Sequence, residues 1–226
     1  MNNEISRSQA VYDHILNKIL TLEYEPGSKI PEEMIAQQMG TSRTPIREAL
    51  RRLATEGLVA LYPNRYAQVV EFSDKDIYDL GLMRIYLDTV ACRLAILHGS
   101  NMDFIKLSTI AKNCDAAAKD LDMRKQITLD SEFHLELAYI SGNNVLKKMQ
   151  SELSLKVNLL QAIRFEGVER RVFHHHKMVE AIMDRDVEKA SKSVIDHLGD
   201  FYNIDIEKQN DKDYFDFAHV FNMGGR

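Results

Sequence analysis

Four residues in the second half of the chain carry side chains that could bind one metal ion together. Asp130 and His134 are four apart, so on a helix they share a face, and His175 and His197 follow on later helical segments. Three imidazoles and one carboxylate that converge inside a helical bundle suit a divalent transition metal such as zinc, nickel or manganese. Spacing constrains only the Asp130–His134 pair, and histidines on helices are more often hydrogen-bonded or exposed. Both interpretations stay open at this point.

Arginines near the start of the chain form a second chemical pattern. Arg43, Arg47 and Arg51 are four residues apart and therefore lie along one helical face. A different face carries the apolar residues of the same segment, Ile46, Ala49, Leu50, Leu53 and Ala54. A short helix that buries one face and shows guanidinium groups on another is suited to a DNA groove lined by phosphates and guanines. The alternative is a solvated basic face on an ordinary surface helix.

Three short helices are predicted to position these arginines. The first is marked by apolar residues at helical spacing, Val11, Ile15, Ile19 and Leu22. Pro31 and two glutamates open the second helix, and Gly40 closes it. In the arginine segment we expect Thr44 to be the cap, Pro45 the first helical residue and Gly57 the stop. The short connection between the second and third helices is typical of a helix-turn-helix.

A basic hairpin is predicted directly after these helices. Segments 58–61 and 67–72 are expected to be strands around the turn Pro63–Asn64, with Arg65 near the tip. Three helices followed by such a hairpin make a winged helix-turn-helix, in which the third helix enters the major groove and the hairpin lies beside it.

The remaining sequence is helical in period almost throughout. We expect helices over six segments: 74–98, 102–119, 123–140, 144–165, 168–184 and 187–207. No proline follows Pro63, which fits long uninterrupted helices. The predicted fold is therefore mainly α, with a winged helix-turn-helix over 1–72 and an all-α bundle of six or seven helices over 73–210. Residues 211–226 would form a C-terminal tail, either a docked turn or a loose end.

The first of these regions is similar to a known DNA-binding domain. The string SRTPIREALRRLATEGLV, followed by PNRYAQV, resembles the domain of GntR-type bacterial transcription regulators over about residues 8–72. The resemblance implies that Arg43, Thr44 and Arg47 contact bases and phosphates, and that Ser42 and Arg65 support them from the helix start and the wing. Arg51 shares the arginine face, so we include it in the predicted DNA-binding surface.

The second region resembles the FCD ligand-binding domain of the FadR-type branch of GntR regulators over about residues 74–205. The motifs are DSEFH, then SGN, then a histidine ahead of AIMDRD, and a histidine on the last helix. The resemblance implies that the metal ligands are Asp130, His134, His175 and His197, with zinc as the first choice and nickel or manganese as alternatives. His174 and His176 flank the third ligand and are interpreted as surface residues, because at most one of three consecutive helical residues faces the centre.

The family resemblance also implies a small carboxylate effector, such as a hydroxy acid, sugar acid or dicarboxylate, bound at open positions of the metal. Arg84 matches an inward-facing arginine of the family and could hold a carboxylate by its guanidinium fork. Asn144 and Arg164 are further candidates for the pocket rim, although each could equally pair with an acid at the surface.

Together these expectations describe a homodimeric transcriptional repressor. It would bind a palindromic operator in double-stranded DNA and respond to an effector. One alternative is a regulator that needs no metal and holds an acyl or aromatic effector in an apolar pocket. Another is a metal-dependent hydrolase with Glu132 or Glu136 as the base. Both glutamates stand two residues from a proposed ligand, which turns them away from the metal, and no nucleophile motif appears. We therefore do not predict an enzyme.

Composition limits the remaining possibilities. The chain has 226 residues, 45% of them hydrophobic, which is enough for two domains and excludes a disordered class. Its net charge is −5, so DNA binding must rest on the local run Arg43–Arg52. No segment has the pattern of a leader or a membrane span, and we expect a cytoplasmic protein without a membrane partner. Cys92 and Cys114 are expected to be buried free thiols, with a redox sensor as the alternative.

Overall fold

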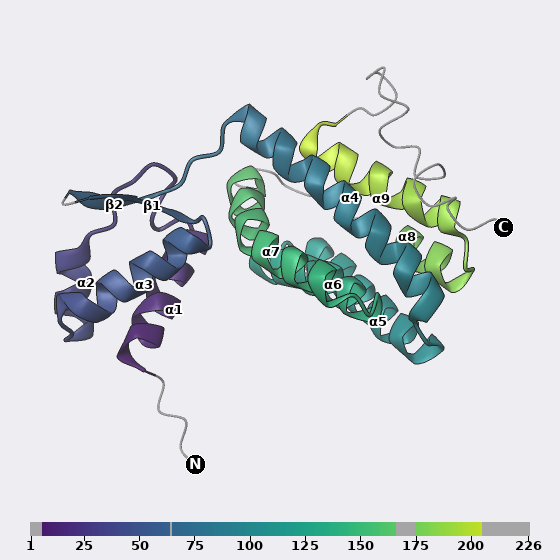
Figure 1. Ribbon diagram of the computed structural model, residues 1–226, viewed down its shortest axis with the longest axis horizontal. Coiled ribbons are helices and arrows are strands. Elements are labelled where there is room, and N and C mark those ends of the chain that lie inside the picture. The colour runs from purple at the N-terminus through teal and green to yellow at the C-terminus, as the bar shows by residue number, and fades with distance from the viewer. Residues whose placement is uncertain (1–5, 64, 166–174, 205–226) are drawn as a thin grey trace, which may run out of the picture.

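The computed structural model describes residues 6–63, 65–165 and 175–204. In its N-terminal part, three helices and a two-stranded hairpin lie together (Figure 1): α1 (Arg7–Leu20), α2 (Glu32–Met39), α3 (Arg43–Thr55), β1 (Val59–Tyr62) and β2 (Tyr66–Val69). The strands are antiparallel, and Tyr62 pairs with Tyr66 beside the turn. The predicted winged helix-turn-helix is confirmed.

The third helix begins earlier than its sequence suggested. Its first residue is Arg43 and its N-cap is Ser42, so the prediction of Thr44 as the cap and Pro45 as the first helical residue was wrong. Pro45 is tolerated because it still lies in the first turn, where backbone N–H groups have no partner within the helix. The predicted stop is confirmed: Gly57 has a φ of +76°, which an L-residue adopts only with strain.

The C-terminal part contains six helices within the described residues. They are α4 (Asp74–His98), α5 (Asn101–Lys119), α6 (Met123–Ile140), α7 (Asn144–Phe165), α8 (His175–Met183) and α9 (Val187–Tyr202). The predicted bounds of the first four agree to within one residue. The last helix ends at Tyr202 rather than at 207, because Asn203 adopts a left-handed conformation as its cap. The start predicted at 168, His174 and the tail over 211–226 lie outside the described residues.

Helix starts in the bundle are fixed by local polar contacts. Ser73 and Ser100 each form a capping box with the aspartate three residues later, and Asp122 and Asp186 cap α6 and α9. These caps satisfy backbone N–H groups that have no partner inside the helix. They explain why the helix starts were readable from the sequence.

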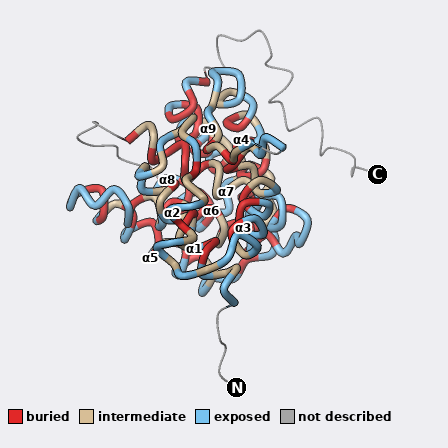
Figure 2. The backbone as a smooth tube through the Cα atoms, turned by 90° about the vertical axis from the view of Figure 1, so that its left-hand side faces the viewer, coloured by how far each residue is buried: buried red, intermediate tan, exposed pale blue. Residues whose placement is uncertain are grey.

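Two hydrophobic cores stabilise the chain, and many of the buried segments lie towards the inside of the molecule in Figure 2. One core lies inside the bundle. The other lies among α1, α2, α3 and the wing, and it also includes Leu159 of α7, which is fully buried there. The C-terminal end of α7 accordingly lies against the N-terminal half in Figure 1. The two halves are thus joined by packing as well as by the segment between β2 and α4.

Both cysteines are free and buried in the bundle core, as predicted. Burial raises the pKa of the Cys92 and Cys114 thiols, so the reactive thiolate form is disfavoured at both. None of the described helices is both long and apolar enough to cross a bilayer.

Candidate functional site

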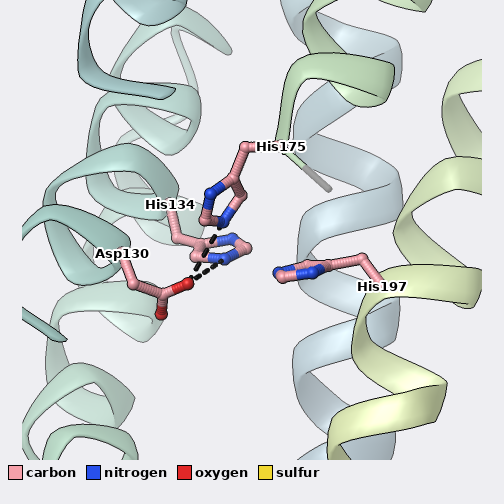
Figure 3. Close-up of side chains that lie close together, drawn as sticks. All are labelled: Asp130, His134, His175 and His197. Atoms are coloured by element: carbon pink, nitrogen blue, oxygen red, sulfur yellow. Dashed lines mark ion pairs between the residues drawn. The ribbon is translucent and has the colours of Figure 1, made fainter. Parts of the chain in front are cut away.

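Three helices bring the four predicted metal ligands together. Asp130 and His134 lie one turn apart on α6, His175 is the first residue of α8, and His197 lies on α9 (Figure 3). One ligand atom from each residue lies within 4.8 Å of all the others, and all four side chains are buried. Residues separated by up to 67 positions therefore form one polar cluster inside an otherwise apolar bundle.

The geometry of this cluster fits a transition metal. His175 Nε2 lies 3.1 Å from Asp130 Oδ1, and His134 Nε2 lies 3.6 Å from the same oxygen. Metal–ligand bonds of about 2.0–2.2 Å separate ligand atoms by up to about 4.3 Å, so a small inward shift of side chains is enough to enclose an ion. A set of three imidazoles and one carboxylate is chemically suited to zinc, nickel or manganese.

Burial and neighbouring charges set the protonation of the cluster. Burial lowers the pKa of His175, and burial together with the nearby imidazoles holds the pKa of His197 well below its usual range. Both rings therefore favour the neutral form that binds metals. Burial alone would raise the pKa of Asp130, but His134 and His175 outweigh it and hold that pKa well below its usual range. The carboxylate is ionised and available as a ligand.

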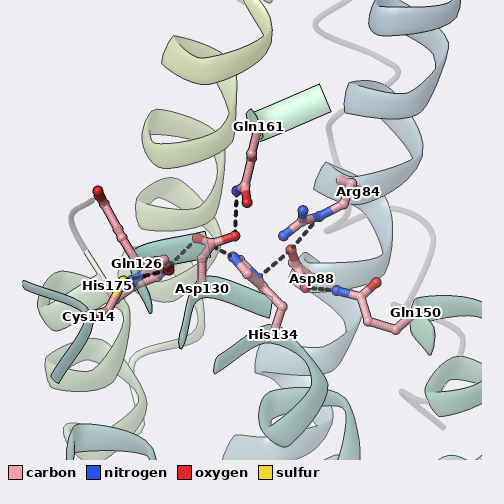
Figure 4. A network of polar contacts seen from close by, with 9 residues as sticks. All are labelled: Arg84, Asp88, Cys114, Gln126, Asp130, His134, Gln150, Gln161 and His175. Atoms are coloured by element: carbon pink, nitrogen blue, oxygen red, sulfur yellow. Dashed lines mark hydrogen bonds and ion pairs between the residues drawn. The ribbon is translucent and has the colours of Figure 1, made fainter. Parts of the chain in front are cut away.

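A second layer of polar side chains orients these ligands (Figure 4). Asp88 Oδ2 lies 2.9 Å from His134 Nδ1, which directs Nε2 of the same ring towards the other ligands. Gln161 Nε2 donates to Asp130 Oδ2 at 2.6 Å, and Gln150 Nε2 donates to Asp88 Oδ1 at 2.7 Å. Neither glutamine was predicted from the sequence, because a single glutamine on a helix carries no spacing signal.

Of the three predicted effector residues, the structure brings only Arg84 to the cluster. Its side chain is 5% exposed, and Nε lies 3.7 Å from Asp88 Oδ2. Arg164 donates instead to the Phe201 carbonyl and stacks over the Phe201 ring, which supports the end of α9. Asn144 is exposed at the first position of α7, away from the residues that line the cavity beside Arg84.

The cavity beside Arg84 and His134 is small, and both polar and apolar side chains line it. Its volume is about 10 Å³, which is room for about one water molecule. Ser131, Leu135 and Asn158 line this cavity and also line a groove of about 520 Å³ on the surface between α6 and α7. A ligand larger than water therefore needs α6 and α7 to separate or their side chains to rotate.

A different surface presents the predicted DNA-binding residues. All of them are exposed: Ser42, Arg43, Thr44, Arg47, Arg51 and Arg65. The four arginines line a concave surface formed by α2, α3 and the wing, and the hollow above it has a volume of about 1170 Å³. The rings of Tyr62 and Tyr66 lie 4.7 Å apart beside the tip of the wing. The surface has the form and charge expected of a helix and wing that dock on a duplex.

The arginines of α3 differ in whether their side chains point to solvent or are held against the protein. Arg43 pairs with Glu33 at 2.8 Å, but both side chains are mostly exposed, so a phosphate can replace the glutamate at little cost. Arg52 folds back onto the Tyr12 ring at 3.7 Å and pairs with Glu56. Within the described part of the chain, Arg47 has no ion pair. Arg52 therefore does not line the concave surface with the other arginines, although it lies in the same basic run.

The glutamates of the hydrolase alternative lie outside the metal cluster. Glu136 accepts a hydrogen bond from Lys106 at 2.6 Å, and Glu132 is exposed. Both line the outer groove rather than the buried cavity. Neither is placed to act as a base on a ligand at the cluster.

Comparison with known proteins identifies both halves. Residues 7–69 match the family of bacterial regulatory proteins called the gntR family, and residues 76–200 match the FCD domain. The Nta operon transcriptional regulator of Aminobacter aminovorans is 29% identical over 183 residues, which is 79% of this chain and 85% of that protein.

Two solved structures share the fold. The structure of E. coli McbR/YncC superposes with a TM-score of 0.75 at 20% identity, covering 88% of this chain and 97% of that one. A GntR-type protein from Rhodococcus sp. RHA1 gives a TM-score of 0.72 at 21% identity, covering 87% and 96%. The relatives with assigned roles are regulators rather than enzymes.

Proposed function

Because the chain belongs to the gntR family of bacterial transcriptional regulators and carries an FCD domain, we propose that its affinity for DNA is controlled by a small carboxylate bound at a metal centre. The observation that carries the proposal is the buried cluster of Asp130, His134, His175 and His197 with Arg84 beside it. Four protein ligands leave positions open on a six-coordinate ion, and an anionic oxygen is the natural occupant.

Zinc is the metal we propose, with nickel or manganese as alternatives. When bound, the ion supplies a Lewis-acidic site for one carboxylate oxygen. The protein's own contribution is to hold His134 through Asp88, to hold Asp130 through Gln161, and to place the Arg84 guanidinium beside the cavity. The buried Arg84 guanidinium beside the cavity supports a carboxylate effector over an apolar one, because it can pair with an anion.

The DNA-binding side of the proposal uses the exposed arginine surface. A homodimer would present two α3 helices to major-groove half-sites of a palindromic operator. Base contacts from Arg43 and Arg47 would select the site, while phosphate contacts, including those of Arg51 and Arg65, would supply affinity. We propose that the protein represses transcription. The effector would favour a state of the dimer in which the distance between the two α3 helices no longer matches the operator half-sites.

Two measurements on the same preparation test this proposal. Elemental analysis after purification without a histidine tag should find one metal ion per chain, and no metal in an Asp130→Ala variant. Thermal-shift screening against small carboxylates should find ligands that raise the melting temperature only when metal is present, because a ligand of the folded state stabilises it. Metal-free protein whose operator binding still responds to a carboxylate would overturn the metal-centred mechanism. Operator binding is followed by mobility shift.

A further inference from the structure

We propose that α7 transmits the state of the metal centre to the DNA-binding half, and that Gln161 is the positioning residue that ties this helix to the centre. The inference rests on the proposed function, because it names the route by which the proposed metal and effector site would act. It follows from the two opposite faces of α7 and from what each face contacts.

One face of α7 holds the two carboxylates of the centre. Gln161 donates to Asp130 at 2.6 Å and Gln150 donates to Asp88 at 2.7 Å, and both glutamines are almost fully buried. Asp88 in turn contacts His134. The hydrogen bonds of α7 therefore reach one ligand directly and a second ligand through one intermediate.

The opposite face of α7 packs into the N-terminal core. Leu155, Leu159 and Ile163 are four residues apart, so they form one stripe, and they pack among the apolar residues of α1, α3 and the wing. A helix turns by about 100° per residue, so Gln161 points about 200° away from Leu159. Lys156 adds a contact at the end of α3, where a side chain at Gly57 would collide with it.

The same turns of α7 therefore contact the metal centre on one side and the N-terminal core on the other. Gln161 stands between Leu159 and Ile163 in the sequence, so a displacement of Asp130 acts on the turn that is embedded in the N-terminal core. Packed cores respond to such shifts by changing arrangement rather than by deforming continuously. A competing route runs through α4, which follows β2 directly, with Phe72 packed against both cores.

Gln161 also decides which oxygen of Asp130 is available to a metal. Its amide occupies Oδ2, and Oδ1 is the oxygen nearest to His175 and His134. Gln161→Met keeps a side chain of similar length and removes the donor, so Asp130 remains a ligand but is no longer tied to α7. Leu155→Ala weakens the other face, and it is chosen because Leu155 is only partly buried.

The test is hydrogen–deuterium exchange of the full-length protein with and without zinc, with bound zinc measured by elemental analysis. In the wild type, zinc should slow amide exchange in α7 and in α3 by about fivefold or more. Gln161→Met should bind zinc more weakly, and at a zinc concentration that saturates it, it should lose most of the change in α3. Leu155→Ala should keep the change in α7 and lose that in α3. Glu152→Met, which places the same new side chain at an exposed position of α7, should behave as the wild type.

The outcomes separate the two proposals. If the wild type binds no zinc, the metal centre of the proposed function falls and this inference falls with it. If zinc binds but exchange in α3 is unchanged, or changes equally in Gln161→Met and in the wild type, α7 is not the route and the proposed function stands. Should Gln161→Met fail to fold by circular dichroism, Leu155→Ala decides: an undiminished change in α3 overturns the inference, and its loss supports it.

Discussion

Two arginines on the same helix differ in what they are free to contact. Arg47 is exposed on the concave surface, whereas Arg52 lies on the Tyr12 ring and pairs with Glu56. A bidentate contact between arginine and guanine contributes about 1–3 kcal/mol of discrimination between bases. Arg47→Ala should therefore lower the preference for operator over random duplex by that amount in mobility-shift titrations.

The matched control for this substitution is Arg52→Gln. It removes a guanidinium from the same helix, but one that contacts protein, so operator preference should stay unchanged while the melting temperature falls. Equal losses of operator preference in both variants would show that net charge, and not the contacts of Arg47, determines DNA binding.

At the proposed metal centre, His134 should make metal binding dependent on pH. Burial alone would lower its pKa, but attraction to Asp88 and Asp130 outweighs this, and the pKa of His134 is raised. The proton competes with a metal for the ring, so zinc affinity should fall as pH drops through this raised pKa and recover above it. Competition titrations with a chromogenic chelator across pH measure the effect.

Asp88→Asn tests the cause of that pH dependence. The substitution removes the negative charge beside His134 Nδ1 and keeps a side chain of the same size. The pKa of His134 should then be lower, and the loss of zinc affinity should move to lower pH. A profile that stays in place, or moves to higher pH, would contradict the assignment to His134.

At the scale of elements, the end of α3 depends on a backbone conformation that only glycine adopts without strain. Gly57 and Gly40 both have positive φ, but a side chain at Gly57 would also collide with Lys156, whereas Gly40 has no neighbour within 4 Å. An L-residue in this region costs about 1–2 kcal/mol. Gly40→Ala and Gly57→Ala should each lower the free energy of unfolding by about that amount in urea titrations, because the end of the flexible Lys156 side chain can move away from a methyl group at Gly57.

Lys156→Ala removes the side chain that an added methyl group at Gly57 would meet. If the end of that side chain moves away freely, the losses of Gly57→Ala and Lys156→Ala should be additive in the double variant. A loss in the double variant smaller than the sum would show that Lys156 is held in place against the end of α3.

At the scale of the whole molecule, a metal bound at the proposed centre would make the stability of the fold depend on whether the centre is occupied. An ion that binds only the folded state adds about 2.7 kcal/mol at a concentration one hundred times its dissociation constant. Treatment with a chelator should therefore lower the melting temperature of the wild type in calorimetry. His197→Ala, which removes a ligand on α9, should melt at one temperature with or without chelator. A wild type indifferent to chelator would argue against a resident metal.

Local sequence determined most of the elements. Apolar residues three and four apart, serine and aspartate caps, and glycines at positive φ predicted the winged helix-turn-helix and the bounds of α4 to α7 within one residue. These signals work because they arise from contacts within one helical turn. The Asp130–His134 pair was readable for the same reason. The full ligand set came from the resemblance to a family, since no spacing connects His175 or His197 to that pair.

Tertiary structure decided what surrounds the site. Only packing shows that Gln161 and Gln150 reach the carboxylates from α7, that Arg164 supports α9, and that Arg52 turns back onto α1. Contacts of this kind join residues tens of positions apart, and they depend on how helices are rotated and stacked against one another. A local pattern gives the inward face of a helix, but not the partner that the face will meet.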